Sequence, residues 1–275
     1  MKFEKTQVMN LEGAFRGLRN PLESWEKSDS AFGIDLEEYF DKDWEVAAAY
    51  IDANEKYDYE EEYDKYFNAQ ENYANWLVEN GILRNQSDCI EYAIIGPKDL
   101  DLAHRMIKAG TSDSKFLRQI NVSVDITAPL YWWKEMDTYK IGTVANSTST
   151  MHKLASTPIT IDCFETDDIS RSLVLTEEST EEGVFGYFIS DFSKDLIKYL
   201  EILRTKYIET KDKKYWKELI RILPEGYLQT RTVTMNYENL YSIVRQRKGH
   251  KLTEWESFIN WVQMLPFADE LIFIQ

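Results

Sequence analysis

Apolar residues that recur at three- and four-residue steps predict a long amphipathic helix in the second half of the chain, because this spacing places them on one helix face. We expect this helix to begin at Ser190 or Asp191, either of which can cap it, and to continue through Tyr207. Its apolar positions are Phe192, Leu196, Tyr199, Leu200, Leu203 and Tyr207. A shorter helix is predicted from about Lys213 to Leu223, where a Leu-Pro-Glu-Gly sequence breaks the chain.

Two further helices are predicted near the C-terminus and one earlier in the chain. The first C-terminal helix extends from about Asn236 to Arg247 and is followed by a basic loop. The second begins where Thr253 and Glu256 can form a capping box. Its apolar face consists of Trp255, Phe258, Ile259, Val262 and Leu265. The earlier helix occupies residues 97–109, between a proline suited to a first helical turn and a glycine suited to a helix end.

Alternating apolar and polar positions predict the strands. Residues 121–127 alternate as a strand with one buried face does, and residues 159–164 alternate in the same way. Between them, Pro129 can start an aromatic-rich turn or helix of residues 130–140. We therefore expect an α+β or α/β fold, whose small and mostly antiparallel sheet is built on strands near 116–127 and 159–164 and flanked by helices.

An acidic segment interrupts this pattern. Residues 35–66 hold thirteen Asp or Glu against three Lys, which accounts for −10 of the chain's net charge of −16. Aromatic and apolar residues at helical steps predict an acidic helical hairpin at about 35–80, inserted within a single domain of residues 1–275. The hairpin can be a solvated outer face, or its carboxylates can imitate a nucleic-acid backbone toward a basic protein partner.

Composition excludes several classes of protein. The net charge of −16 disfavours direct binding to nucleic acid or to anionic membranes. No apolar run approaches the roughly 20 residues of a membrane helix, and the N-terminal residues lack a signal-peptide core, so we expect a soluble, cytoplasmic protein. The two cysteines and three histidines form no metal-ligand spacing, and we expect no metal.

The candidate chemistry lies in separated polar residues, since no phosphate loop, dinucleotide fingerprint, nucleophile elbow or zinc motif occurs. Asn236 and Arg247 are eleven residues apart, about three helical turns or roughly 16 Å, so both can line one elongated pocket. Arg231 lies just upstream, where its guanidinium can grip a phosphate. Taken singly, each of these residues also fits a surface ion pair or a helix-end contact.

Two stretches of motifs carry a family resemblance. Leu-Pro at 223, Thr-Arg at 230, Asn236, Arg247 and Trp-Glu at 255 follow one another in the order of the C-terminal motifs of flavin-dependent thymidylate synthases of the ThyX type. Upstream, Ala-Pro at 128, Trp-Trp at 132 and Asn-Ser-Thr-Ser at 146 follow the outline of the family's central motif. The chain resembles this family over about residues 97–165 and 223–265.

The resemblance implies roles for particular residues. Arg231 matches the arginine that holds the nucleotide phosphate, and Arg247 matches the one that orients the pyrimidine. Ser147 and Ser149 belong to the loop that cradles the nucleotide. On the cofactor side, the resemblance places Asn236 and Asn146 near the flavin, with Tyr139 and Lys140 standing in the segment of the family's Arg-His-Arg motif.

That segment departs from the family, because the Arg-His-Arg triplet falls on Thr138, Tyr139 and Lys140. A flavin diphosphate and a nucleotide phosphate together bring about three negative charges, which several arginines neutralise through charge-assisted hydrogen bonds. Here only Lys140 retains a positive charge. The flavin site is therefore the part of the resemblance that the sequence supports least.

The sequence leaves open whether the chain is an enzyme. If the family activity is retained, the resemblance implies methylation of a deoxyuridylate in dTMP biosynthesis, with FAD, NADPH and methylenetetrahydrofolate, in a homotetramer. The alternative is a catalytically inactive protein of the same fold that binds a pyrimidine deoxynucleotide. A third hypothesis is an interaction protein whose acidic hairpin engages a basic partner.

Overall fold

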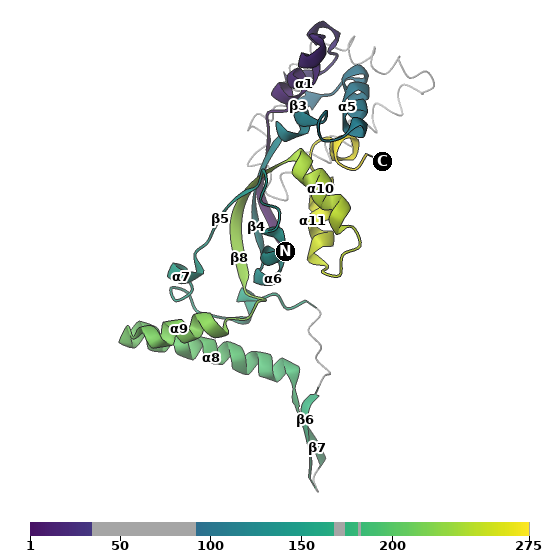
Figure 1. Ribbon diagram of the computed structural model, residues 1–275. Coiled ribbons are helices and arrows are strands. Elements are labelled where there is room, and N and C mark those ends of the chain that lie inside the picture. The colour runs from purple at the N-terminus through teal and green to yellow at the C-terminus, as the bar shows by residue number, and fades with distance from the viewer. Residues whose placement is uncertain (35–91, 168–173, 181–182, 275) are drawn as a thin grey trace. The chain divides into compact units, whose positions relative to one another are not determined.

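The computed structural model describes residues 1–34, 92–167, 174–180 and 183–274 (Figure 1). The expected acidic hairpin of residues 35–80 lies outside these ranges. The described chain is a mixed fold of helices and antiparallel sheet, which confirms the predicted fold class.

The largest sheet has four strands in the order β1-β4-β8-β5. They are β1 (Lys2–Met9), β4 (Asn121–Pro129), β5 (Val144–Ser147) and β8 (Leu228–Asn236). Residues of β4 alternate between half-buried and buried, as the sequence pattern predicts. The strand begins at Asn121 rather than near residue 116, because a 3-10 helix of Lys115–Arg118 precedes it. The other three strands of this sheet, β1, β5 and β8, were not predicted from the sequence.

Two antiparallel pairs complete the strands. In one pair, β2 (Ala31–Ile34) lies opposite β3 (Tyr92–Ile94), so the residues on either side of 35–91 meet. In the other, β6 (Val174–Thr180) pairs with β7 (Gly183–Phe188).

The chain divides into two compact units. The first consists of residues 1–2, 126–139 and 145–232, and the second of residues 3–125, 140–144 and 233–275. Strands β4 and β8 contribute residues to both. Each unit has its own core and is described by itself.

The core of the first unit lies against two helices, α8 (Ile189–Thr210) and α9 (Lys213–Ile222), which lie side by side (Figure 1). Both confirm the predicted helices, but α8 begins at Ile189, so Ser190 and Asp191 lie within the helix and neither is the cap that the sequence predicted. The core cluster consists of Leu154, Ile159, Phe164, Leu200, Leu203 and Leu219. Asp212 caps α9 by accepting a hydrogen bond from the backbone nitrogen of Lys214. The remaining helices here are α6 (Leu130–Met136) and α7 (Thr150–Lys153).

The predicted strand at 159–164 is wrong. Residues Ile161–Cys163 form a 3-10 helix, and only Phe164 makes an isolated bridge, to Tyr227. The backbone nitrogen of Ile159 donates to the Glu201 carboxylate at 2.8 Å instead of to a neighbouring strand. Ile159 and Phe164 are buried in the core cluster, whereas Ile161 is 46% exposed, so the apolar residues of this segment do not share one buried strand face.

The described part of the second unit contains α1 (Leu11–Arg19), α5 (Pro97–Ala109), α10 (Tyr237–Arg247), α11 (Glu254–Gln263) and α12 (Ala268–Leu271), together with three short 3-10 helices, Asn20–Leu22, Trp25–Lys27 and Lys115–Arg118. The predicted helices at 97–109 and 236–247 are confirmed within one residue. Gly110 ends α5 with φ 108°, a conformation that favours glycine. Of the predicted apolar face on α11, Ile259 is half-buried and the other four are buried, as is Trp261.

The capping box predicted at the start of α11 is wrong. Thr253 has helical backbone angles and its side chain makes no cap hydrogen bond. An N-cap hydroxyl can reach the N2 or N3 nitrogen only from an extended backbone, so the helical conformation of Thr253 removes this option. The backbone nitrogen of Glu256 instead donates to the Thr253 carbonyl.

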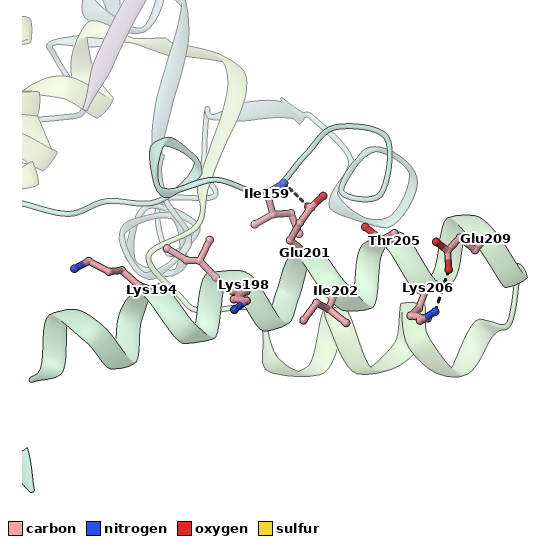
Figure 2. Close-up of a pocket in the computed structure, with 9 residues that line it drawn as sticks. Ile159, Lys194, Lys198, Glu201, Ile202, Thr205, Lys206 and Glu209 are labelled. Carbon is pink, nitrogen blue, oxygen red and sulfur yellow. Dashed lines mark hydrogen bonds and ion pairs between the residues drawn. The ribbon is translucent and has the colours of Figure 1, made fainter. Parts of the chain in front are cut away.

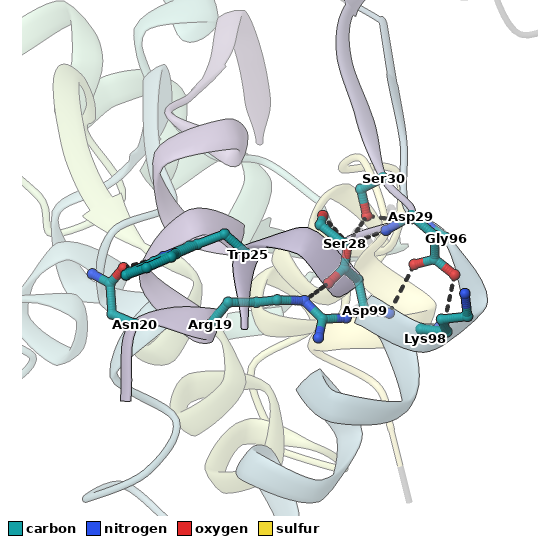
Figure 3. A network of polar contacts seen from close by, with 9 residues as sticks. All are labelled: Arg19, Asn20, Trp25, Ser28, Asp29, Ser30, Gly96, Lys98 and Asp99. Atoms are coloured by element: carbon teal, nitrogen blue, oxygen red, sulfur yellow. Dashed lines mark hydrogen bonds and ion pairs between the residues drawn. The ribbon is translucent and has the colours of Figure 1, made fainter. Parts of the chain in front are cut away.

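A buried ion pair joins the N-terminal helix to α5 in this unit (Figure 3). Nε of Arg19 lies 2.6 Å from Oδ1 of Asp99, whose side chain is fully buried. The hydroxyls of Ser28 and Ser30 donate to the other carboxylate oxygen, each at 2.6 Å. Asp29 caps the start of α5 by accepting from the backbone nitrogen of Lys98.

None of the helices among the described residues is long and apolar enough to cross a membrane.

Candidate functional site

Strand β8 carries Arg231, and three side chains hold its guanidinium from different directions. Nη1 donates to Oδ1 of Asp137 at 2.7 Å, and Nε donates to Oε1 of Gln229 at 2.9 Å. The guanidinium carbon lies 4.3 Å from the ring centroid of Trp133, within the range of a cation–π contact. The side chain of Arg231 is 15% exposed, so the guanidinium is held in place yet reachable from solvent.

Gln229 ties this arginine to the loop after β5. Its side-chain Nε2 donates to the carbonyl of Thr148 at 2.9 Å, and its backbone carbonyl accepts from Nε1 of Trp133 at 2.9 Å. The backbone nitrogen of Thr148 also donates to the carbonyl of Thr230 at 2.9 Å. The structure therefore brings Arg231 and the loop with the predicted nucleotide-binding serines into one neighbourhood. We call Trp133, Asp137, Thr148, Gln229 and Arg231 the Arg231 cluster.

The predicted residues of the loop differ in exposure. Asn146 and Ser147 lie on the exposed strand β5. Ser149 is half-buried, and its carbonyl accepts from the backbone nitrogen of Lys153, which places Ser149 at the start of α7. Hydroxyls at these positions are of the type that donates to phosphate oxygens.

Asn236 has a local structural role. Its Oδ1 accepts from the backbone nitrogen of Asn239 at 3.0 Å, and Oδ1 of Asn239 accepts from the backbone nitrogen of Asn236 at 3.1 Å. This reciprocal pair is a capping box at the start of α10. Nδ2 of Asn239 also donates to the carbonyl of Ile141 at 2.7 Å, so the segment with the exposed Lys140 lies beside this cap.

Gly142 allows that segment to approach the cap. Its φ is 74°, a left-handed conformation, and a Cβ built there would lie 2.9 Å from Oδ1 of Asn239 and 3.0 Å from Nδ2 of Asn236. Two of the residues predicted to bind the cofactor, Asn236 and Lys140, therefore share one part of the second unit.

Arg247, at the C-terminal end of α10, stacks on an aromatic ring. Its guanidinium carbon lies 4.5 Å from the centroid of Trp255, and Nη1 lies 3.2 Å from Nε2 of His250. The backbone nitrogen of Leu252 donates to Nδ1 of His250 at 3.2 Å, which orients the imidazole. Stacking of this kind covers one face of the planar guanidinium, and its N–H groups point outward in the plane.

The donor groups in the segment aligned with the Arg-His-Arg motif do not fit a flavin diphosphate. The hydroxyl of Thr138 donates to the carbonyl of Glu135, and Tyr139 is uncharged. Lys140 adds one positive charge, and the neighbouring Asp137 is an anion paired with Arg231. A diphosphate at residues 138–140 would therefore meet a single positive charge from them.

Sequence reasoning missed Trp133, Asp137 and Gln229 as partners of Arg231. Gln229 and Arg231 are two residues apart, so on a strand they lie on the same face. An alternating pattern in β8 was the signal that could have found this pair. Asp137 had no such signal, because its contact with Arg231 joins residues 94 positions apart.

A separate groove of about 480 Å³ follows the surface of α8 (Figure 2). Its lining residues are Ile159, Lys194, Ile197, Lys198, Glu201, Ile202, Thr205, Lys206 and Glu209. Hydrogen bonds from Arg204 and from the backbone of Ile159 hold the pKa of the Glu201 carboxyl below its ordinary value, against the opposing effect of burial. None of the residues predicted for nucleotide or cofactor binding lines this groove.

The chain matches no protein-family profile and no curated protein sequence. It is similar in structure to the flavin-dependent thymidylate synthase ThyX from Helicobacter pylori complexed with FAD and dUMP, with a TM-score of 0.55 and 15% identity over 99% of this chain and 98% of that chain. A second structure of ThyX from Helicobacter pylori with FAD and dUMP gives a TM-score of 0.56 and 15% identity, over 99% and 97% of the two chains.

A third similar structure is the UMP/dUMP methylase PolB from Streptomyces cacaoi bound with 5-Br UMP. Its TM-score is 0.44, with 12% identity over 63% of this chain and 82% of that chain. The two ThyX structures establish that this chain has a ThyX-like fold. The resemblance indicated by the motifs is therefore confirmed at the level of the fold.

Proposed function

We propose that the protein binds a pyrimidine deoxynucleotide, with deoxyuridylate as the expected ligand and Arg231 as the group that receives its phosphate. The fold supports this proposal, because the similar ThyX structures contain dUMP. One fold hosts many functions, so we infer the ligand from the residues of the site.

The observation that carries the proposal is the way in which the guanidinium of Arg231 is held. Gln229 fixes Nε and Trp133 supports one face, so the arginine loses little further freedom when an anion binds. Among the residues that the structure describes, Nη2 has no hydrogen-bond partner and can donate to a phosphate oxygen. A rigid guanidinium is the side chain best suited to two-pronged phosphate contacts.

Two serines of the same unit complete the proposed phosphate site at Arg231. Ser147 and Ser149, on the loop that Gln229 ties to β8, supply hydroxyl donors to the phosphate. Arg247, stacked on Trp255, supplies donors in the plane of its guanidinium, which suits the carbonyl oxygens of a pyrimidine.

The complete family reaction is the second candidate function. The similarity to FAD-bound ThyX over nearly the whole chain favours it. It requires FAD, with Asn236, Asn146, Tyr139 and Lys140 in the cofactor roles, and it implies NADPH, methylenetetrahydrofolate and a homotetramer. The single positive charge of residues 138–140 argues against this candidate, and so nucleotide binding is the function that we propose first.

Thermal unfolding in the presence of dUMP tests the proposal, because a ligand that binds only the folded state raises the melting temperature. At a ligand concentration of 100 times Kd, the stabilisation is about 2.7 kcal/mol. We expect the increase for the wild type and for Arg105→Gln, which removes an exposed arginine paired with Asp101. Arg231→Gln should abolish it. An unchanged increase in Arg231→Gln would contradict the assigned role of Arg231.

Arg247→Ala tests the proposed contact between Arg247 and the pyrimidine base. It should also abolish the dUMP-induced increase, while the loss of stacking on Trp255 lowers the free energy of unfolding by about 1 kcal/mol. A much larger loss of intrinsic stability would favour a purely structural role for Arg247.

A visible absorption spectrum separates the two candidate functions. Flavin absorption in the purified protein, or after incubation with FAD and removal of unbound cofactor, would support the complete reaction. Absence of flavin together with a dUMP-induced increase in melting temperature would support nucleotide binding alone. The hypothesis that residues 35–80 engage a basic partner stays a prediction, and unchanged partner binding after their deletion would contradict it.

A further inference from the structure

The charge balance of the Arg231 cluster is unusual for a phosphate site. Arg231 brings one positive charge, and Asp137 cancels it at 2.7 Å. The two other side chains that hold the guanidinium, those of Gln229 and Trp133, are neutral. A ligand phosphate therefore meets a guanidinium that is already paired with an anion.

Asp137 is not required to hold the arginine in position. Gln229 fixes Nε, and Trp133 supports the face of the guanidinium, whereas Asp137 contacts only Nη1. The carboxylate of Asp137 is 53% exposed, so water can replace its contact with Arg231 at small cost.

The position of Asp137 on its helix makes the carboxylate easier to displace. It is the C-cap residue of α6, and its backbone nitrogen donates to the carbonyl of Trp133 at 2.8 Å. Unpaired carbonyl groups give this end of a helix a partial negative charge, which disfavours a carboxylate. The contact with Arg231 is the compensating interaction that the structure records.

We propose that Asp137 is a specificity-determining residue of the phosphate site, an internal anion that occupies Nη1 of Arg231 and competes there with the ligand phosphate. This inference rests on the proposed nucleotide function. Asp137 lowers the affinity for ligands that carry a phosphate but not for the uncharged nucleoside. The ratio of these two affinities is therefore smaller than it would be without the carboxylate.

The test compares the dissociation constants of dUMP and deoxyuridine for the wild type, Asp137→Asn and Asp101→Asn, measured by calorimetry at low salt. Asp137→Asn keeps the shape of the side chain and removes its charge. We expect it to bind dUMP about twofold to fivefold more tightly and deoxyuridine with unchanged affinity. The gain should shrink as salt is added, since screening weakens exposed charges. Asp101→Asn removes an exposed carboxylate paired with Arg105 and should leave both constants unchanged.

Unchanged or weaker dUMP binding in both Asp137→Asn and Asp137→Ser would overturn the inference, because Asp137 would then be a support for Arg231. Tighter binding of deoxyuridine to the same extent as dUMP would overturn it as well. If neither the wild type nor the variants bind dUMP, the proposed function fails and this inference fails with it. Binding of dUMP by Asp137→Asn but not by the wild type would support the inference in its strongest form.

Discussion

Arg19 and Asp99 form a fully buried ion pair that joins α1 to the first turn of α5, with Nε and Oδ1 2.6 Å apart. The hydroxyls of Ser28 and Ser30 satisfy the second carboxylate oxygen (Figure 3). Burial raises the pKa of the Asp99 carboxyl, but the hydrogen bonds from Ser28, Ser30 and Arg19 outweigh this effect and lower the pKa below its ordinary value. The carboxylate is therefore the stable form in the folded protein.

Asp99→Asn should be strongly destabilising. The substitution leaves the charge of Arg19 buried without its partner, a change that costs about 3–5 kcal/mol of unfolding free energy. Urea denaturation followed by circular dichroism measures it. Asp101→Asn, on the exposed face of the same helix, is the matched control and should change stability by less than about 0.5 kcal/mol. Equal effects of the two variants would show that the buried pair contributes little.

The same pair predicts how stability depends on pH. The pKa of Asp99 is lower in the folded chain than its ordinary value of 3.8, so the unfolded chain binds the proton more readily. The stabilisation from this group is fully present above the unfolded pKa and is lost as the pH falls from about 3.8 through the folded pKa. The stability difference between the wild type and Asp99→Asn should therefore be constant from pH 7 to about 5 and shrink below 3.8. A difference that grows on acidification would contradict the direction of the shift.

Asn236→Ala tests whether Asn236 stabilises the folded chain through its capping box. Loss of the side chain removes the hydrogen bond to Asn239 at the start of α10 and should cost about 1 kcal/mol. Asn236→Ser should retain most of the stability, because serine is also a favoured cap. Asn260→Ala, at an exposed position on α11, is the control and should not destabilise. If Asn236→Ala leaves the unfolding free energy unchanged, the cap is not the role of Asn236.

Leu200→Ala should destabilise the first unit. Leu200 is fully buried in the cluster between α8 and α9, and truncation of such a leucine costs about 2–5 kcal/mol. Ile202→Ala, on the same helix but 48% exposed, should cost much less. Thermal and urea unfolding of both variants measure the difference, and equal losses would contradict the assigned core.

The helices could be predicted largely from sequence, because their signals are local. The spacing of apolar residues located α9 and α10 within one residue and α8 within three, and Pro97 and Gly110 marked the ends of α5. The strands were harder to predict. Strand β8 was missed, and the alternation of residues 159–164 misled. This segment contains a 3-10 helix, and in it Ile159 and Phe164 are buried and Ile161 is exposed, so six alternating positions did not define a strand.

The residues of the candidate site could be selected from sequence, but their surroundings could not. Arg231, Arg247 and Asn236 stood out by type and by their place in a family outline. That outline did not reveal the stacking of Arg247 on Trp255 or the capping role of Asn236.

The sequence by itself determined the helical elements, the class of the fold and the arginines on which a nucleotide site would depend, because periodicity, caps and residue type act over a few neighbouring positions. Only the tertiary structure decided that Asp137 and Gln229 contact Arg231, and that Asp99 is a buried partner of Arg19. Most of these contacts join residues far apart in the chain. The charge balance at Arg231 is set by such a contact, with Asp137, and no local pattern encodes it.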